Sequence, residues 1–118
     1  MKSTDGDAAD LEVMRESAEK ASRLLKALSN QDRLLILCLL AGGEKCVSEV
    51  EELLGIRQPT LSQQLSRLRA DSLVATRREG KVVHYRLASS EAGRVMELLY
   101  EMYCVPAMAR RQDEAAVA

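Results

Sequence analysis

The stretch that most constrains this chain is RQPTLSQQLSRLR, residues Arg57–Arg69. Pro59 suits the first turn of a helix, where its missing N–H costs no hydrogen bond. Leu61, Leu65 and Leu68 then recur at helical spacing and form an apolar line. A neighbouring line on the same helix is polar and consists of Thr60, Gln63, Gln64 and Arg67. One face therefore suits a protein core, and the next suits a DNA groove, because hydroxyl, amide and guanidinium groups bond base edges and phosphates.

The residues before this stretch predict a supporting helix. Ser48 is a candidate N-cap, Glu51 follows three residues later as in a capping box, and Gly55 ends the helix. Residues 56–58 then make a tight turn into the polar-faced helix. This order is that of a helix-turn-helix, so we expect Arg57–Arg69 to hold the recognition helix.

A basic hairpin is predicted next. Leu73–Arg78 and Lys81–Leu87 are rich in Val, Thr and Tyr, with Glu79–Gly80 as the turn. The tip reads RREGK, so its cations can reach phosphates or an adjacent minor groove. We expect this hairpin to act as the wing of the DNA-binding unit.

The charge is distributed unevenly along the chain. Residues 57–86 contain seven Lys or Arg and two acids, a net charge of +5, whereas the remainder has ten and sixteen, a net charge of −6. A charge run alone is often just a solvated face. Here the basic block coincides with the helix and the hairpin, as expected of a localised phosphate-binding surface.

Three further helices are predicted around this unit. The first, residues 10–28, has a heptad-like seam, and the last, from Ser89 or Ser90 to about Val105, has another. Either seam can pack within the domain or on a partner chain. Gln31–Ala41, capped by Asn30, contains LLILCLL and is apolar all round, so we expect it to be central and buried. The two seams consist of Leu11, Met14, Ala18, Ala21, Leu25 and Leu28, and of Val95, Leu98, Met102 and Val105.

The length of 118 residues suits one domain. We expect a disordered tail over residues 1–9, a domain over residues 10–105 and a polar tail over residues 106–118, beginning at Pro106. No apolar run approaches the roughly 18 residues of a membrane span, and the first residues lack the apolar centre of a signal peptide. The predicted location is therefore cytoplasmic, with no membrane partner. The fold class is mainly α with a small β-hairpin wing.

The order of the elements, together with QPTLSQQLSRLR and LVATRREGKVVHYRL, resembles the ArsR/SmtB-type family of winged-helix transcriptional repressors over roughly residues 10–105. The resemblance implies a homodimer formed by the first and last helices. Such a dimer would bind a palindromic operator in double-stranded DNA, with recognition helices about 34 Å apart. The residues expected to contact DNA are Gln58, Thr60, Ser62, Gln63, Gln64, Arg67, Arg77, Arg78 and Lys81, with Gln63 and Gln64 as base readers.

Metal-sensing members of that family use a CVC motif before the third helix or His and acidic ligands on the last helix. This chain has Cys46-Val47-Ser48, and its only histidine, His84, lies in a hairpin strand. A metal needs three or four convergent ligands, so we expect neither metal nor cofactor. A metal- or metalloid-responsive repressor using cysteines across a dimer remains the alternative.

Cys38 and Cys104 carry the remaining regulatory hypothesis. A cysteine in an apolar helix is most often a small hydrophobic residue. However, the contexts RLLILC and LLYEMYC resemble the BigR/SqrR/HlyU-like branch, which senses persulfides and related oxidants through a dithiol. By this resemblance, reactive sulfur species would join Cys38 to Cys104 directly or through inserted sulfur atoms, leaving Cys46 unpaired.

Two other functions are compatible with parts of the sequence. A constitutive DNA-binding regulator or antirepressor would use its cysteines only in the core. An enzyme is disfavoured, because the chain has no CxxC, no base beside a nucleophile and no α/β pocket pattern. We therefore expect no catalytic residue.

Overall fold

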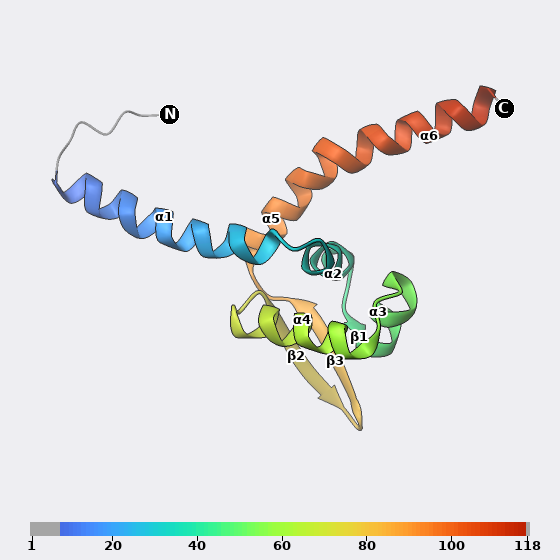
Figure 1. The fold of residues 1–118 in the computed structure, drawn as a ribbon, viewed down its shortest axis with the longest axis horizontal. Helices are drawn as coiled ribbons and strands as arrows, with labels where there is room; N and C mark the ends of the chain where they lie inside the picture. The colour runs from blue at the N-terminus through green and yellow to red at the C-terminus, as the bar shows by residue number, and fades with distance from the viewer. Residues whose placement is uncertain (1–7, 118) are drawn as a thin grey trace.

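The computed structural model describes residues 8–117 of the chain (Figure 1). Most of the predicted N-terminal tail lies outside the described residues, and Ala8 and Ala9 already belong to the first helix. The elements are α1 (Ala8–Leu28), α2 (Gln31–Ala41), β1 (Lys45–Cys46), α3 (Val47–Leu54), α4 (Gln58–Ala70), β2 (Val74–Glu79), β3 (Val82–Leu87), α5 (Ser90–Leu99), the π-helix η1 (Tyr100–Cys104) and α6 (Val105–Val117). The prediction of a mainly helical winged fold is confirmed.

The core is built around one side of α2. Ile36, Leu37 and Leu40 are buried against the helix-turn-helix and α5. The predicted apolar line of α4 supplies much of the rest, and Leu61, Leu65 and Leu68 are at most 1 % exposed. The core is completed by Ala27, Leu28, Val50, Leu73, Val74, Ala92 and Met96.

The prediction that α2 is buried all round is wrong. Leu35 is 40 % exposed, and Cys38 is also exposed. The predicted N-cap is present, with Asn30 Oδ1 accepting from the Arg33 N–H at 3.0 Å. The reason is that a small domain covers only one side of this helix. An uncovered apolar face remains on α2 beside α5.

The sheet has three antiparallel strands in the order β1-β3-β2. The register pairs Glu79 with Val82, so the turn residues are Gly80 and Lys81, one position later than predicted. Gly80 has φ +62, and a positive φ at the first turn residue is typical of a type II′ hairpin. The third strand, β1, pairs Cys46 with His84 and connects the chain after α2 to the wing.

The cap of α3 also differs from the prediction. Its N-cap is Cys46 rather than Ser48, and the capping carboxylate is Glu49 rather than Glu51. Because β1 leaves Cys46 extended, at φ −87 and ψ 167, the helix begins directly after it. The Cys46 N–H donates to Glu49 Oε1 at 3.0 Å.

The last helix does not end at Pro106, where a polar tail was expected. The chain widens into the π-helix η1, in which the Val105 N–H bonds the Tyr100 carbonyl oxygen, and then continues as α6. Pro106 thus lies in the first turn of α6, where a proline is tolerated. The wider π-helical turn explains why the chain stays helical across Pro106.

Two helical arms project from the body in different directions, α1 on one side and α5 with η1 and α6 on another (Figure 1). Their seams are exposed: Leu11 is 43 % exposed, Leu25 62 % and Leu98 54 %. Among residues 8–117, no helix is both long and apolar enough to cross a membrane.

Candidate nucleic-acid interface

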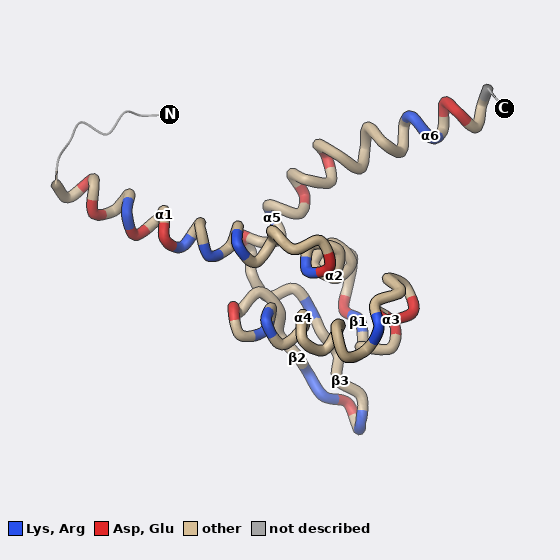
Figure 2. The backbone as a smooth tube through the Cα atoms, in the orientation of Figure 1, with Lys and Arg blue, Asp and Glu red and all other residues tan. Residues whose placement is uncertain are grey.

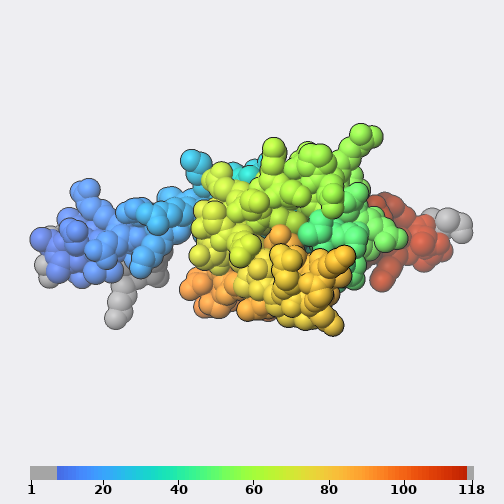
Figure 3. All heavy atoms as spheres, turned by 90° about the horizontal axis from the view of Figure 1, so that it is seen from below, coloured from blue at the N-terminus to red at the C-terminus, as the bar shows by residue number. Residues whose placement is uncertain are grey.

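Helix α4 presents the predicted polar line to solvent. Because Leu61, Leu65 and Leu68 face the core, the residues between them turn outward, and all predicted contacts on α4 except one are exposed. Seen from below, α4 and the hairpin together cover the middle of one face of the molecule (Figure 3). The exposed residues on α4 are Gln58, Thr60, Ser62, Gln63 and Arg67.

Gln64 is the exception. It is half-buried, and its Oε1 accepts a hydrogen bond from Nη1 of Arg33 at 3.0 Å. Arg33 also donates through Nε to the Ala27 carbonyl oxygen at 2.8 Å. Gln64 therefore serves as a link between α4 and α2. Its side-chain oxygen is engaged within the protein, unlike the amide of the exposed Gln63.

The C-terminal turn of α4 carries Arg67, whose Nε lies 3.2 Å from Oδ2 of Asp71. Both side chains are substantially exposed, at 46 % and 37 %, so the pair is weak and a phosphate can replace the carboxylate. Arg69, two positions later, is also exposed. This end of α4 is suited to contacts with the phosphate backbone of a duplex.

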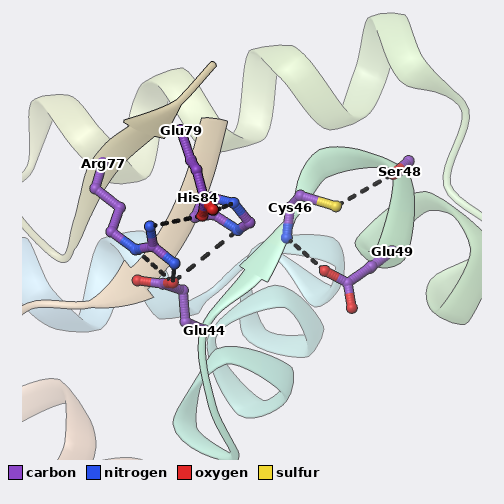
Figure 4. Close-up of polar contacts among 7 residues, drawn as sticks. All are labelled: Glu44, Cys46, Ser48, Glu49, Arg77, Glu79 and His84. Atoms are coloured by element: carbon purple, nitrogen blue, oxygen red, sulfur yellow. Dashed lines mark hydrogen bonds and ion pairs between the residues drawn. The ribbon is translucent and has the colours of Figure 1, made fainter. Parts of the chain in front are cut away.

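The hairpin carries the other predicted cations. Arg78 and Lys81 are exposed, and Figure 2 shows that cations mark the strand and the tip of the hairpin. Arg77 is differently placed, because its guanidinium is bound by acids. Its Nη2 lies 2.6 Å from Oε1 of Glu44, and its Nη1 lies 3.1 Å from Oε2 of Glu79 (Figure 4).

His84 joins the same cluster from β3. Its Nε2 lies 3.5 Å from Oε2 of Glu79 and its Nδ1 lies 4.0 Å from Oε1 of Glu44 (Figure 4). The hydrogen bond from Arg77 is the main reason that the pKa of Glu44 is lowered. Glu44 is therefore an anion at neutral pH, and the cluster is an ion-pair network between the α2–β1 connection and the wing.

The two candidate sensor cysteines are free and exposed. The thiol of Cys38 lies against α5, with Sγ 3.5 Å from Sδ of Met96, and it borders a groove of about 340 Å³ that Tyr100 also lines. Burial of this sulfur raises the pKa of Cys38, and the charge of Cys104 raises it further.

Cys46 lies elsewhere, at the start of α3. Its Sγ is 3.2 Å from Oγ of Ser48. Over residues 8–117, no group of three or more His, Cys, Asp or Glu side chains is arranged to hold a metal ion. All three cysteines are free thiols.

Two residues that engage predicted DNA contacts, Arg33 and Glu44, were not predicted from the sequence. Arg33 reads as an ordinary charge in the first turn of α2, and Glu44 reads as a solvated loop residue after two glycines. Each makes a contact with a side chain more than thirty positions away, Arg33 with Gln64 and Glu44 with Arg77. No local signal marks such pairs.

Comparison with known proteins agrees with this architecture. Residues 30–76 match the bacterial regulatory protein, arsR family. The biofilm growth-associated repressor of Agrobacterium fabrum is 49 % identical over 96 residues, covering 81 % of this chain and 82 % of the relative. The transcriptional activator HlyU of Vibrio cholerae is 43 % identical over 99 residues, covering 84 % and 92 %.

Solved structures give the same result. Reduced HlyU from Vibrio cholerae superposes with a TM-score of 0.76 at 44 % identity, covering 79 % of this chain and 98 % of that one. The transcriptional repressor BigR from Xylella fastidiosa gives 0.74 at 44 % identity, covering 79 % and 95 %. These relatives are transcriptional regulators rather than enzymes. The chain belongs to the ArsR family of bacterial regulatory proteins, within the branch that contains BigR and HlyU.

Proposed function

We propose that this chain is a homodimeric transcriptional repressor that binds a palindromic operator and is released when Cys38 and Cys104 are oxidised by reactive sulfur species. The observation that carries the DNA-binding part is the exposed polar face of α4, which shares one side of the molecule with the basic hairpin (Figure 3). A helix of this kind enters the major groove, while the wing reaches phosphates nearby. Its place of action is then the cytoplasm.

The dimer is supported by the apolar residues left exposed on the two helical arms. Leu25 on α1 is 62 % exposed, and Leu98 on α5 is 54 % exposed. Exposed apolar seams of this length favour burial against a second copy. A two-fold dimer presents two copies of α4, so its affinity depends on their spacing as well as on their side chains.

The thiol control is supported by the placement of two free cysteines on different elements. Cys38 lies on α2 in the body of the domain, whereas Cys104 lies at the end of η1 on the arm formed by α5, η1 and α6. A bridge between them would tie the arm to the body and change the setting of the two half-site readers. A coupling of about 1–3 kcal/mol is the usual size of such an effect.

The chemistry balances with a persulfide as the oxidant. One cysteine thiolate attacks the sulfane sulfur of RSSH and expels RS⁻, which leaves a protein persulfide. The second thiolate attacks the protein-bound sulfur atom and expels HS⁻, which leaves a Cys–S–S–Cys bridge. Two protein thiols are oxidised and one persulfide is reduced. A longer bridge forms when sulfur atoms from further persulfide molecules are retained.

The test is operator binding by reduced and persulfide-treated protein, measured with Cys38→Ser, Cys104→Ser and Cys46→Ser variants. We expect treatment to weaken wild type and Cys46→Ser by five- to a hundredfold, and to leave the other two variants unchanged. Cys46→Ser is the matched control, because it removes a thiol outside the pair. Mass spectrometry should find the Cys38 and Cys104 peptides linked.

Other results lead to other functions. Stoichiometric zinc or arsenite binding that lowers operator affinity, without any sulfur adduct, would identify a metal-responsive repressor. Operator binding that ignores both oxidant and metal would identify a constitutive regulator with structural cysteines. Absence of sequence-specific DNA binding by the reduced dimer would overturn the proposal as a whole.

A further inference from the structure

Two carboxylates, Glu44 beside the wing and Glu79 on it, engage a cation that the DNA surface would otherwise use. Glu44 Oε1 lies 2.6 Å from Nη2 of Arg77 and 2.7 Å from its Nε. Oε2 of Glu79 lies 3.1 Å from Nη1, the third nitrogen of the Arg77 guanidinium. All three nitrogens of the guanidinium are therefore bonded to carboxylates (Figure 4). The fork that would bind a phosphate faces Glu44 instead.

We propose that Glu44 competes with DNA phosphate for Arg77 and thereby sets the strength and the salt dependence of DNA binding by the wing. This inference rests on the proposed DNA-binding function. It assigns Glu44 a positioning role: the residue need not touch DNA, since it acts through the side chain that does.

The backbone places Glu44 for this role. It follows Gly42 and Gly43, and Gly43 has φ +148, a conformation that favours glycine. The next residue begins β1, which pairs with β3 at the inner end of the wing. The loop after α2 is thus directed so that a carboxylate from outside the hairpin meets a cation of β2.

The balance between carboxylate and phosphate is a close one. The Glu44 side chain is 28 % exposed and that of Arg77 is 49 % exposed, so water screens their attraction. A phosphate approaching the wing can replace the carboxylate, but it must displace Glu44 to do so. Among residues 8–117, the side chains of Arg78 and Lys81 make no hydrogen bond or ion pair, so these two cations bind phosphate without such a competitor.

This arrangement has a consequence for regulation. Phosphate contacts are independent of sequence and raise the affinity for operator and genomic DNA alike. A repressor that is released by a modest coupling needs an affinity that the coupling can overcome. By engaging Arg77, Glu44 removes one phosphate contact and keeps the DNA affinity low enough for the coupling to overcome.

The experiment compares Glu44→Gln with Glu52→Gln on the operator and on random duplex, across a range of salt concentrations. Both variants remove one negative charge from neighbouring parts of the molecule, but Glu52 lies on α3 without contact to Arg77. We expect Glu44→Gln to bind both DNAs three- to tenfold more tightly than Glu52→Gln. Its plot of log K against log salt should be steeper by about 0.9, as expected for one additional phosphate contact.

A double-mutant cycle makes the claim specific. In an Arg77→Ala background, Glu44→Gln should have no more effect than Glu52→Gln. Glu44→Asp, which keeps the charge, should return the salt slope to that of wild type. Weaker binding by Glu44→Gln, an unchanged slope, or an effect that persists without Arg77 would overturn the inference. Failure of the wild-type protein to bind the operator would instead reject the proposed function.

Discussion

Nη1 of Arg33 on α2 lies 3.0 Å from the side-chain oxygen of Gln64 on α4. The same guanidinium donates to the carbonyl oxygens of Ala27 and Lys26, at 2.8 Å and 3.3 Å, where α1 ends. One side chain thus connects the end of α1, the start of α2 and the middle of α4. Gln64, expected from the sequence to read a base, is part of this connection.

The two neighbouring glutamines of α4 should therefore behave differently. Gln64→Ala leaves a half-buried guanidinium nitrogen without its partner, and we expect a loss of about 1–2 kcal/mol of folding free energy, measured by denaturant unfolding. Gln63→Ala should leave folding within about 0.5 kcal/mol of wild type, because Gln63 is exposed.

The DNA measurements should complete the contrast. Gln63→Ala should lower operator affinity by roughly 1–3 kcal/mol while random-duplex affinity stays near wild type. Gln64→Ala should affect the two DNAs by similar factors. If Gln63→Ala and Gln64→Ala reduce the preference for operator over random duplex equally, Gln64 reads a base despite its bond to Arg33.

Lys81 should behave as a phosphate contact. It is an exposed residue of the hairpin turn, beside Gly80. We expect Lys81→Ala to weaken operator and random DNA by the same factor and to reduce the salt slope by about 0.9. Lys81→Arg, with the charge retained, is the control. A loss confined to the operator would contradict the assignment.

The pKa of Cys38 gives a pH prediction. Since burial and the charge of Cys104 raise this pKa, Cys38 is a thiol at neutral pH, and its thiolate fraction rises only as pH rises toward that value. Alkylation of Cys38 by iodoacetamide should thus be slower than that of a free cysteine at pH 7 and increase about tenfold per pH unit below the pKa. Cys104→Ser should lower the pKa without abolishing the shift, because burial against Met96 persists.

The sequence was sufficient for the elements whose signals are local and periodic. The three leucines of α4 gave its buried face, Asn30 gave the start of α2, and the Val- and Tyr-rich runs gave the hairpin. It failed where the structure depends on a distant partner. β1 has only two residues, and it exists because β3 is beside it, so the cap of α3 moved to Cys46.

The candidate site shows the same division. Which residues of α4 are exposed follows from the helical period, because burial of Leu61 and Leu65 decides where Gln63 points. Which side chains are free to bind DNA does not follow, because Glu44 engages Arg77 and Arg33 engages Gln64. The prediction that the last helix ends before Pro106 was wrong, because the chain continues through a π-helical turn into α6.

Glu49 contributes stability that depends on pH. The Cys46 N–H, bonded to its carboxylate, is the main cause of its lowered pKa. A lowered folded-state pKa stabilises the fold above the unfolded value of about 4.3, and this contribution is lost as pH falls through the folded value. Glu49→Gln should therefore be less stable than wild type at pH 7, and the difference should shrink below about pH 4. A difference that is constant from pH 7 to pH 3 would show that the charge is not involved.

Leu25 tests the dimer through the seam of α1. It is 62 % exposed in the single chain, so Leu25→Glu should leave the folded subunit intact. In a dimer the new carboxylate would be buried in an apolar seam without a partner, which is strongly unfavourable. We expect the dimer dissociation constant to rise by at least about 100-fold, or close to 3 kcal/mol, measured by sedimentation equilibrium. Operator affinity should fall with it, because each monomer reaches only one half-site.

Val13 supplies the matched control for this prediction. It is also 62 % exposed and lies on the same helix, but outside the heptad-like seam of Leu11, Met14 and Leu25. Val13→Glu introduces the same charge on the same helix outside the seam, so it should change dimerisation by less than tenfold. Circular dichroism of both variants should match wild type. If the two substitutions dissociate the dimer equally, general repulsion along α1 is responsible, and the seam is not the interface. If neither does, dimerisation rests on the α5 arm, and Leu98→Glu becomes the deciding variant.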